Sequence, residues 1–306
     1  MSDIYTGLPK VIQGHVFFDE PLSQHTTIRV GGPAKVLVIP KTTQDLIHCF
    51  ALAAKEKMPY MVMGNGSNIL FSDQGYEGMI IKTKGGLSSI SIEGNIVTAG
   101  AGVLTAELLN VVEAKGLGGL EFMVGVPATI GGAVSMNLGA FGSQLSDYIV
   151  SVKLADNAGE IREESNIAFG YRSADLGGRM VVEVKLKLKN DNTASLRQEK
   201  ENYLEKRRSA YGMEFPHAGS VFKNPPGLYA GKLLQDAGLK GFRAGNAMFS
   251  DKHANVIINL GNASYSDILA LIDEGVSRVK KQFGIDLVLE LKIVGGAKIG
   301  YCCSRG

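Results

Sequence analysis

The chain has 306 residues, of which 45% are hydrophobic and 20% are charged. This length predicts two or three domains with sizeable cores, and the composition is ordinary for a globular enzyme. The formal net charge is +2, from 32 basic and 30 acidic residues, so we expect no nucleic-acid partner. No segment approaches the roughly 18–20 uninterrupted apolar residues that span a bilayer, so we expect no membrane insertion.

The cysteines and histidines argue against a disulfide framework and a bound metal. Cys49, Cys302 and Cys303 form no CxxC pair, and the five histidines lack the spacing of metal ligands. Such cysteine usage is typical of a reducing compartment. Residues 1–9 are polar and lack the apolar centre of a secretory signal. We therefore expect a cytoplasmic protein without a metal. A monomer is our separate expectation, which no motif in the sequence determines.

The first third of the chain alternates strand and helix patterns. Thr43 is expected to cap a helix that runs to about Lys57, where Pro59 ends it. Glu93-Gly94-Asn95 between two apolar runs indicates a hairpin. The strands expected here are 36–39, 60–63, 78–83, 90–92 and 96–99, and a second helix is expected over 105–115.

The remaining elements continue this mixture, so the sequence predicts an α+β fold. A hairpin is expected over 148–162, a half-buried strand over 179–189, and a highly charged helix over 194–211. Beyond them we expect a short helix at 229–237, a strand at 254–259, a helix at 266–283 and a strand at 285–294. The last helix carries a core-facing row at helical spacing, formed by Ile268, Ile272, Val276, Val279 and Phe283.

Two glycine-rich segments are the most informative feature. Residues 116–142 contain eight glycines, and a second segment, 64–68, follows an apolar strand. Glycine costs backbone entropy, so clustering it needs a reason, such as close approach of backbone N–H groups to a pyrophosphate. Either segment alone could be an ordinary tight turn. Together they favour a dinucleotide cofactor.

The familiar nucleotide fingerprints are absent. Gly64-x-Gly66 is followed by Asn68-Ile69, without the third glycine of the G-x-G-x-x-G pattern, and no Gly-Lys-Ser/Thr closes either segment. The cofactor must therefore bind to a different flavin or nucleotide scaffold.

Five separated motifs, in order from about residue 26 to 295, carry a specific resemblance. They are Gly64-Asn65-Gly66-Ser67-Asn68, Val126–Ala133 with Asn137, Tyr171-Arg172, Ala218–Pro225, and Lys252-His253-Ala254 followed by Glu290. Together they resemble the UDP-N-acetylenolpyruvoylglucosamine reductases, flavoproteins with the vanillyl-alcohol-oxidase (PCMH) type of FAD-binding fold.

The resemblance implies a three-part α+β organisation. Residues 1–85 would form the first FAD-binding subdomain, with the tail 295–306 as an optional part of it. Residues 86–205 would form the second subdomain, and residues 206–294 a C-terminal α+β substrate domain. The FAD is expected to be non-covalent, because no histidine lies in 64–68 or 125–142.

The reaction that the resemblance implies is reduction of an enolpyruvyl ether on a UDP-sugar, giving UDP-N-acetylmuramate for peptidoglycan. NADPH is the co-substrate. Hydride addition to the alkene drives negative charge toward the carboxylate, so the site needs a cation there and a proton donor beside the carbanionic carbon. The resemblance gives these roles to Arg172 and Ser220, with Glu290 stabilising the enol. Without it, each would more often be a surface or turn residue.

Further residues carry over as binding residues. Tyr171, Lys223 and Asn224 are candidates for the substrate, and Arg207 for the flavin pyrimidine. The expected FAD contacts come from the glycine-rich segments: Gly64, Asn65, Gly66, Ser67, Asn68, Gly125, Pro127, Ala128, Thr129, Gly131, Gly132, Ala133 and Asn137.

The chain departs from the family pattern at three positions. Ala174 replaces a serine, Leu289 stands where arginine often precedes the glutamate, and Asn246 stands where a second glycine is usual. None removes a proposed catalytic group. The short interval between Arg172 and Ser220 leaves no room for a tyrosine-bearing insertion, which matches the shorter subclass.

Two other functions stay open. An FAD-dependent oxidase of the same superfamily would act on an alcohol and reoxidise with oxygen. A non-catalytic regulator that binds a UDP-sugar or flavin would need none of Arg172, Ser220 and Glu290.

Overall fold

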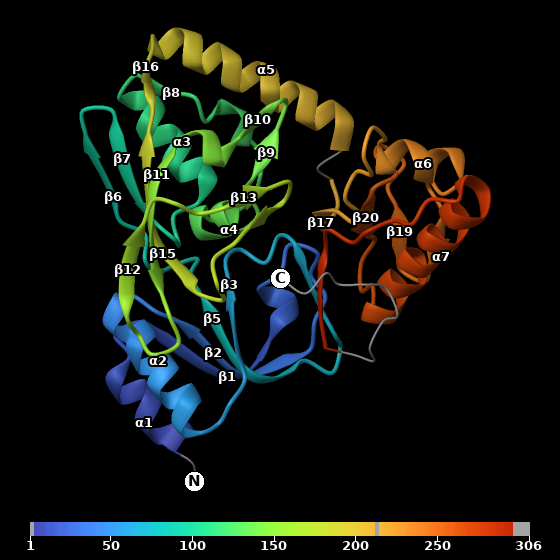
Figure 1. Ribbon diagram of the computed structural model, residues 1–306. Helices are drawn as coiled ribbons and strands as arrows, with labels where there is room; N and C mark the ends of the chain where they lie inside the picture. Colours follow the sequence, from blue (N-terminus) through green and yellow to red (C-terminus); the bar gives the residue numbers. More distant parts are fainter. Residues whose placement is uncertain (1–2, 212–213, 296–306) are drawn as a thin grey trace. The chain divides into compact units, whose positions relative to one another are not determined.

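The computed structural model describes residues 3–211 and 214–295 (Figure 1). The last residues of the chain, with Cys302 and Cys303, lie outside this description, as does any role of the tail after residue 295. The chain divides into two units. Unit 1 takes residues up to 19, 35–65 and 77–205, and unit 2 takes 20–34, 66–76 and the residues from 206 onward.

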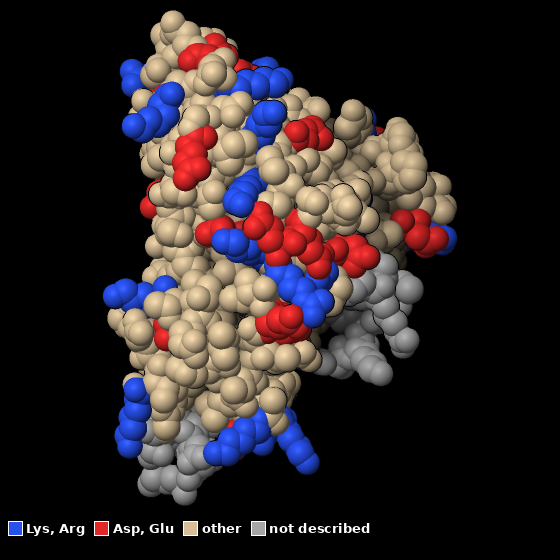
Figure 2. All heavy atoms as spheres, turned by 60° about the vertical axis from the view of Figure 1, so that its left-hand side comes forward, with Lys and Arg blue, Asp and Glu red and all other residues tan. Residues whose placement is uncertain are grey.

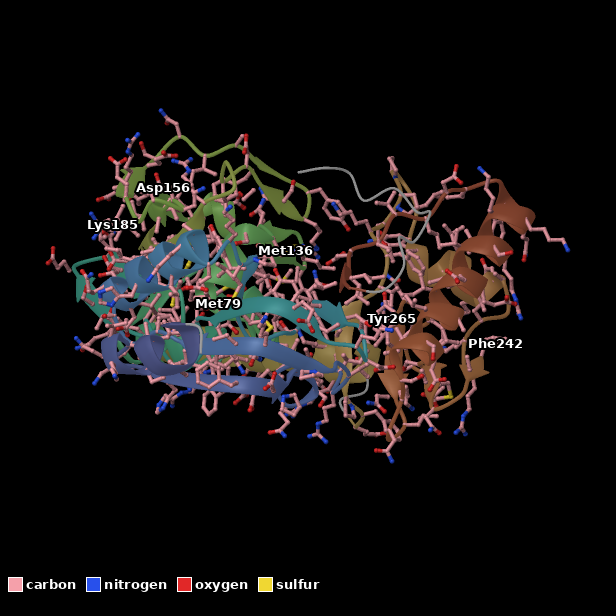
Figure 3. All side chains as sticks on the ribbon, turned by 90° about the horizontal axis from the view of Figure 1, so that it is seen from below. Met79, Met136, Asp156, Lys185, Phe242 and Tyr265 are labelled. Atoms are coloured by element: carbon pink, nitrogen blue, oxygen red, sulfur yellow. The ribbon has the colours of Figure 1, made fainter. Side chains whose placement is uncertain are left out.

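The first layer of unit 1 places two helices on a four-stranded sheet. The helices α1 (Asp3–Val11) and α2 (Thr43–Lys55) contact each other and pack on this sheet (Figure 1). The buried cluster beneath them includes Leu8, Leu46 and Met79, the last of which is labelled in Figure 3. The strand order is β1 (His15–Pro21), β2 (Pro33–Ile39), β5 (Tyr76–Lys82) and β3 (Tyr60–Met63), with β3 and β5 parallel.

The start of α2 differs from the expectation by one residue. Thr42 is the N-cap, not Thr43, because the Thr42 Oγ1 accepts from the Asp45 N–H and Asp45 accepts in return from the Thr42 N–H. Asp45 also accepts from the N–H groups of Gln13 and Lys41, at 2.9 and 2.7 Å. Its carboxylate therefore ties the segment after α1 to the start of α2.

The second layer of unit 1 is an antiparallel five-stranded sheet, covered on its apolar face by α3 (Thr105–Ala114) and α4 (Ile130–Ser135). On the outer face, cross-strand pairs such as Lys153–Glu183 (2.8 Å) and Lys185–Glu163 (2.9 Å) place opposite charges side by side. Basic and acidic side chains also lie next to one another on the face of the molecule shown in Figure 2. The strand order is β12 (Ile161–Glu164), β11 (Ile149–Ala155), β15 (Met180–Lys187), β7 (Ile96–Gly100) and β6 (Ile90–Glu93). Both expected hairpins are confirmed.

One long helix and several short elements complete this part of the chain. The long helix α5 (Thr193–Tyr211) belongs to unit 1 up to residue 205 and to unit 2 beyond it. The remaining elements of unit 1 are β8 (Leu117–Gly118), η2 (Glu121–Met123), β9 (Gly139–Ala140), β10 (Ser143–Gln144), η3 (Leu145–Asp147), β13 (Phe169–Gly170), β14 (Ser173–Ala174) and β16 (Lys189–Asn190).

Unit 2 is built on an antiparallel sheet whose apolar face packs against α6 (Ala230–Asp236) and α7 (Tyr265–Phe283) (Figure 1). Its strand order is β17 (His217–Ser220), β20 (Val256–Asn259), β19 (Ala247–Phe249) and β18 (Arg243–Ala244). A separate parallel pair joins β4 (Ile69–Phe71) to β21 (Lys292–Val294), and η1 (Leu22–Gln24) precedes β2. The early segments 20–34 and 66–76 contribute Ile28, Val30 and Leu70 to this core.

The last helix matches its expected span closely, but the prediction that Phe283 faces the core was wrong. Ile268, Ile272 and Val279 are fully buried, whereas Phe283 is 36% exposed, because α7 ends there and Gly284 follows in a left-handed conformation. Tyr265 at the helix start, labelled in Figure 3, donates its hydroxyl to the Gly295 carbonyl at 3.1 Å.

The strand expected over 285–294 is confirmed only at its end. Only Lys292–Val294 forms a ladder, although Leu287 and Leu291 are buried as the alternation predicted. Alternating burial thus arises without a partner strand along most of this segment. Within the described residues, no helix has the length and apolarity to cross a membrane.

Candidate functional site

The first glycine-rich segment passes from unit 1 into unit 2 between Asn65 and Gly66. In unit 1, the Asn65 Nδ2 donates to the Pro127 carbonyl at 2.6 Å. A Cβ on Gly64 would lie 2.3 Å from the Thr129 Oγ1, so only glycine fits there. The two glycine-rich segments, far apart in sequence, therefore lie against each other.

The second segment is equally tightly packed. A Cβ on Gly131 would lie 2.8 Å from the Ala101 Cβ, and the Gly131 N–H donates to the Ala101 carbonyl. Thr129 caps α4 by accepting from the Gly132 N–H at 3.3 Å. Gly131 is therefore required by its packing against Ala101.

The other residues of unit 1 that were predicted to contact FAD differ in their surroundings. Gly125 has a φ of +74°. The Ala128 carbonyl accepts from the Thr105 N–H, and Ala133 is buried in the core with its N–H donated to the Thr129 carbonyl. Asn137 uses its amide inside the protein: Nδ2 donates to Gly170 and Gln144, and Oδ1 accepts from Ser146.

Asn137 thereby supports the turn that carries Arg172. Its Nδ2 lies 3.1 Å from the Gly170 carbonyl, at the end of β13. Residues 171 and 172 form the two-residue connection between β13 and β14, in which Gly170 pairs with Ser173. Arg172 has a φ of +55°, in the left-handed region that a non-glycine residue seldom adopts. Its guanidinium lies 5.3 Å from the ring centre of Tyr171, which is 54% exposed.

Within unit 2, Thr27 joins the first glycine-rich segment to β17. The Thr27 N–H donates to the Gly66 carbonyl at 3.0 Å, and its hydroxyl donates to the His217 carbonyl at 2.6 Å. Gly66 has a φ of +66°, and a Cβ there would lie 2.3 Å from the His25 carbonyl. The backbone around Gly66 is therefore fixed by residues 25–27.

Unit 2 also brings Ser220 and Glu290 into one backbone network. The Glu290 N–H donates to the carbonyl of Val221, the residue after Ser220, at 2.8 Å. Asn68 then holds the same segment, because its Nδ2 donates to the Glu290 carbonyl at 3.0 Å and its own carbonyl accepts from the Lys292 N–H. Two of the three predicted catalytic residues and one predicted FAD residue are thus neighbours, while Arg172 belongs to unit 1.

A buried amide fixes the chain beyond Ser220. Asn255 is 3% exposed, and its side chain bonds both polar groups of the Phe222 backbone: Oδ1 accepts from the N–H at 3.0 Å and Nδ2 donates to the carbonyl at 2.8 Å. The Asn255 carbonyl accepts from the Val221 N–H. An amide that satisfies a peptide group in this way holds it as a strand neighbour would.

The predicted substrate residues follow directly. The Lys223 N–H donates to the Val288 carbonyl at 2.8 Å, and the Asn224 Oδ1 accepts from the N–H of Ala230, the first residue of α6, at 3.0 Å. Arg207 is half-buried near the end of α5. Among the family departures, Asn246 donates its N–H to Asp267, and Leu289 bridges to Phe222.

Sequence reasoning missed three residues that organise this site: Thr27, His217 and Asn255. A polar side chain within a buried strand pattern was the available signal for Asn255, since such a group must find hydrogen-bond partners. The bond between Thr27 and His217 leaves no comparable local signal, because the two residues are 190 positions apart.

A cavity of about 210 Å³ lies elsewhere in unit 1. Its lining includes Glu121, Tyr148, Glu199 and Tyr203, and none of the predicted site residues. Among the described residues, no group of three or more histidine, cysteine or acidic side chains is arranged to hold a metal ion.

Comparison with known proteins assigns both parts of the chain. Residues 34–165 match a family described as FAD binding domain, and residues 210–294 match the UDP-N-acetylenolpyruvoylglucosamine reductase C-terminal domain. The expected α+β organisation, an FAD-binding fold followed by a separate C-terminal domain, is confirmed.

Full-length relatives extend this match. The UDP-N-acetylenolpyruvoylglucosamine reductase of Moorella thermoacetica is 45% identical over 297 residues, covering 96% of this chain and 97% of the relative. That of Caldanaerobacter subterraneus is 39% identical, covering 92% and 95%. The crystal structure of the Thermus caldophilus reductase superposes with a TM-score of 0.79 at 33% identity, covering 93% of this chain and all of the other. This chain therefore belongs to the UDP-N-acetylenolpyruvoylglucosamine reductase family.

Proposed function

We propose that this protein is an FAD-dependent, NADPH-using oxidoreductase that reduces UDP-N-acetylenolpyruvoylglucosamine to UDP-N-acetylmuramate for peptidoglycan synthesis. The observation that carries this proposal is the network in unit 2, where Asn68 of a glycine-rich segment and Val221 beside Ser220 both bond the backbone of Glu290. Family membership over nearly the whole chain supports the same substrate. We further propose a cytoplasmic monomer and the division 1–85, 86–205 and 206–294, in which residues 20–34 and 66–76 of the first part pack in the core of the third.

The glycine-rich segments fit the phosphates of FAD. Gly64 lets the first segment lie against Thr129 of the second, and we expect the backbone of residues 64–68 to approach the pyrophosphate. The bound flavin would supply the hydride chemistry. We propose non-covalent binding: no histidine lies within the glycine-rich segments, and His25, whose carbonyl lies next to Gly66, has its ring Nε2 paired with Glu20 at 2.8 Å.

Three side chains would then act on the substrate. Arg172 holds the carboxylate, because a guanidinium can bond both of its oxygens and offset the charge that develops there. Ser220 gives its proton to the carbon next to that carboxylate. Glu290 stabilises the enol form, and Tyr171, Lys223 and Asn224 bind the nucleotide sugar.

An absorbance experiment tests the overall proposal. The purified protein should be yellow, lose its flavin absorbance with NADPH under anaerobic conditions, and regain it when the enolpyruvyl UDP-sugar is added. NADH is the control donor. A colourless protein would favour the non-catalytic regulator. Bleaching by an alcohol, with reoxidation by oxygen alone, would favour the oxidase.

The role of Ser220 is tested by separating the two half-reactions. In Ser220→Ala, flavin reduction by NADPH should stay near normal, while reoxidation by the substrate should fall by about 100-fold or more, the typical worth of a general acid. Ser220→Cys, which keeps a donor, should recover part of that loss. Equal slowing of both half-reactions would mean that the serine is not the proton donor.

A further inference from the structure

The strand that carries Ser220 contains an extra residue. In the antiparallel pair of β17 and β20, His217 lies opposite Ile258 and Ser220 lies opposite Val256. Three steps along β17 thus correspond to two along β20, which defines a β-bulge. In an unbroken ladder Ser220 would face Asn255 instead, and its side chain would point to the other side of the sheet.

The bulge therefore decides which face Ser220 presents. Residues directly opposite each other in an antiparallel pair share a face, and Val256 and Ile258 share one because they are two apart. Ser220 consequently faces the same side as His217. Ala218 takes the opposite side, where it is buried in the core beneath α6 and α7. A register without the bulge would turn the serine toward that core.

Two local features maintain the bulge. Gly219 has a φ of +73°, which any other residue adopts at a cost. Its N–H donates to the Nδ1 of His217 at 3.1 Å, which closes a short ring around the extra residue. A Cβ added at Gly219 would come no closer to another residue than 3.8 Å, at the Ser67 carbonyl oxygen, so conformation rather than space calls for glycine.

His217 is suited to accept this bond. Burial lowers the pKa of its imidazole below the ordinary value of about 6.5, so the ring is neutral at pH 7. A neutral ring whose Nδ1 accepts must carry its proton on Nε2. The Thr27 hydroxyl fixes the main chain of the same residue through the His217 carbonyl at 2.6 Å.

We propose that His217 is a positioning residue for substrate reduction: by accepting the Gly219 N–H it holds the bulge that presents the Ser220 hydroxyl. This inference rests on the proposed function, in which Ser220 is the proton donor. It assigns His217 no contact with the substrate and no transfer of the proton.

Three substitutions of one residue, His217→Asn, His217→Gln and His217→Leu, test this role. In the asparagine variant the amide oxygen would lie as far along the side chain as Nδ1, whereas in the glutamine variant it would match Nε2. We expect His217→Leu to slow reoxidation by the enolpyruvyl UDP-sugar by about 10–100-fold, with flavin reduction by NADPH unchanged, because small misplacements are costly. His217→Asn should restore reoxidation to within about threefold.

Two outcomes would overturn the inference. If His217→Gln restores reoxidation and His217→Asn does not, the Nε2 side of the ring matters and the bulge does not explain the effect. If His217→Leu reoxidises normally while Ser220→Ala is slow, the serine needs no support from His217. A normal Ser220→Ala would instead overturn the role of Ser220 in the proposed function.

Gly219→Ala examines the same bulge without touching the imidazole. Space exists for the methyl group, so the variant should fold, but a positive φ disfavours alanine. We expect slower reoxidation with normal flavin reduction, as in His217→Leu. Normal reoxidation in Gly219→Ala, with a structure in which the bulge is lost, would contradict the proposal even if His217→Leu failed to fold.

Discussion

Arg172 combines an unfavourable backbone conformation with a predicted catalytic role. A non-glycine residue in the left-handed region costs about 1–2 kcal/mol, and such strain gathers at functional sites. Asn137 and the pairing of β13 with β14 hold the turn in place. These contacts keep Arg172 in its unfavourable backbone conformation. A substitution that relieves this strain therefore tests the role of Arg172.

Replacing Arg172 by glycine should separate stability from activity. In Arg172→Gly, the positive φ is no longer unfavourable, so the thermal midpoint should stay the same or rise, while reduction of the enolpyruvyl substrate should fall by at least about 100-fold. The control is Arg179→Gly, which loses the contact with Glu164 at 2.9 Å from an ordinary backbone conformation and should be less stable. If Arg172→Gly kept full activity, Arg172 would not be a catalytic residue.

His253 makes stability depend on pH. Burial, and more weakly the charge of Lys240, lower its pKa below the ordinary value of about 6.5. The unfolded chain therefore binds a proton more readily than the folded chain, so stability is full above about pH 6.5 and declines as pH falls toward the folded pKa.

Denaturant unfolding at about pH 7.5 and about pH 5.5, on either side of the ordinary histidine pKa, measures this effect. The free energy of unfolding should decrease between the two values, and His253→Gln should reduce the decrease. The exposed His15→Gln is the control variant. If the free energy of unfolding falls between the two pH values by the same amount in His253→Gln, other groups cause the pH dependence.

Among the elements, α2 depends on its cap. Burial alone would raise the pKa of Asp45, but N–H donors from Gln13, Lys41 and Thr42, with the Thr42 hydroxyl, outweigh it and lower the pKa. The stabilisation is therefore present above the unfolded value near pH 4 and lost as pH falls through the folded pKa.

Asp45→Asn should lower the free energy of unfolding at pH 7 by about 2 kcal/mol, because bonds to a charged group are lost from a fully buried site. Asp236→Asn, which disturbs only the exposed pair with Lys232, should cost less than about 0.5 kcal/mol. Equal effects in urea unfolding would mean that the Asp45 bonds add nothing specific.

Other elements show where local patterns stop being sufficient. The hairpins at 90–100 and 149–164 were predicted because their strands pair with their sequence neighbours. The stretch 285–294 alternates like a strand, yet its backbone bonds mostly single residues such as Val221 and Asn68. Alternation reports burial, and only the presence of a partner strand makes a ladder.

At the scale of the whole molecule, unit 2 cannot be assembled from the C-terminal sequence alone. Ile28, Val30 and Leu70 belong to its core, and the Asn259 side chain donates to the Ile28 carbonyl at 2.9 Å. A fragment that starts at residue 206 would lack the residues that make these contacts.

We therefore expect a 206–306 fragment to lack a cooperative unfolding transition and dispersed amide resonances. The full chain, which contains residues 20–34 and 66–76, should show both the cooperative transition and the dispersed resonances. Without these residues the core would contain large cavities, which cost several kcal/mol each. A sharply folded 206–306 fragment would show that the early segments are dispensable to this core.

The sequence by itself determined the α+β class, most helices, the local hairpins and the family, because these depend on short-range patterns and on motifs that survive in order. It also named Ser220 and Glu290, whose backbones the structure joins. Tertiary structure alone decided that the first glycine-rich segment is shared between two units, that Asn137 bonds within the protein, and that a bulge turns Ser220. Those features depend on pairing between residues tens to hundreds of positions apart, which no local pattern records.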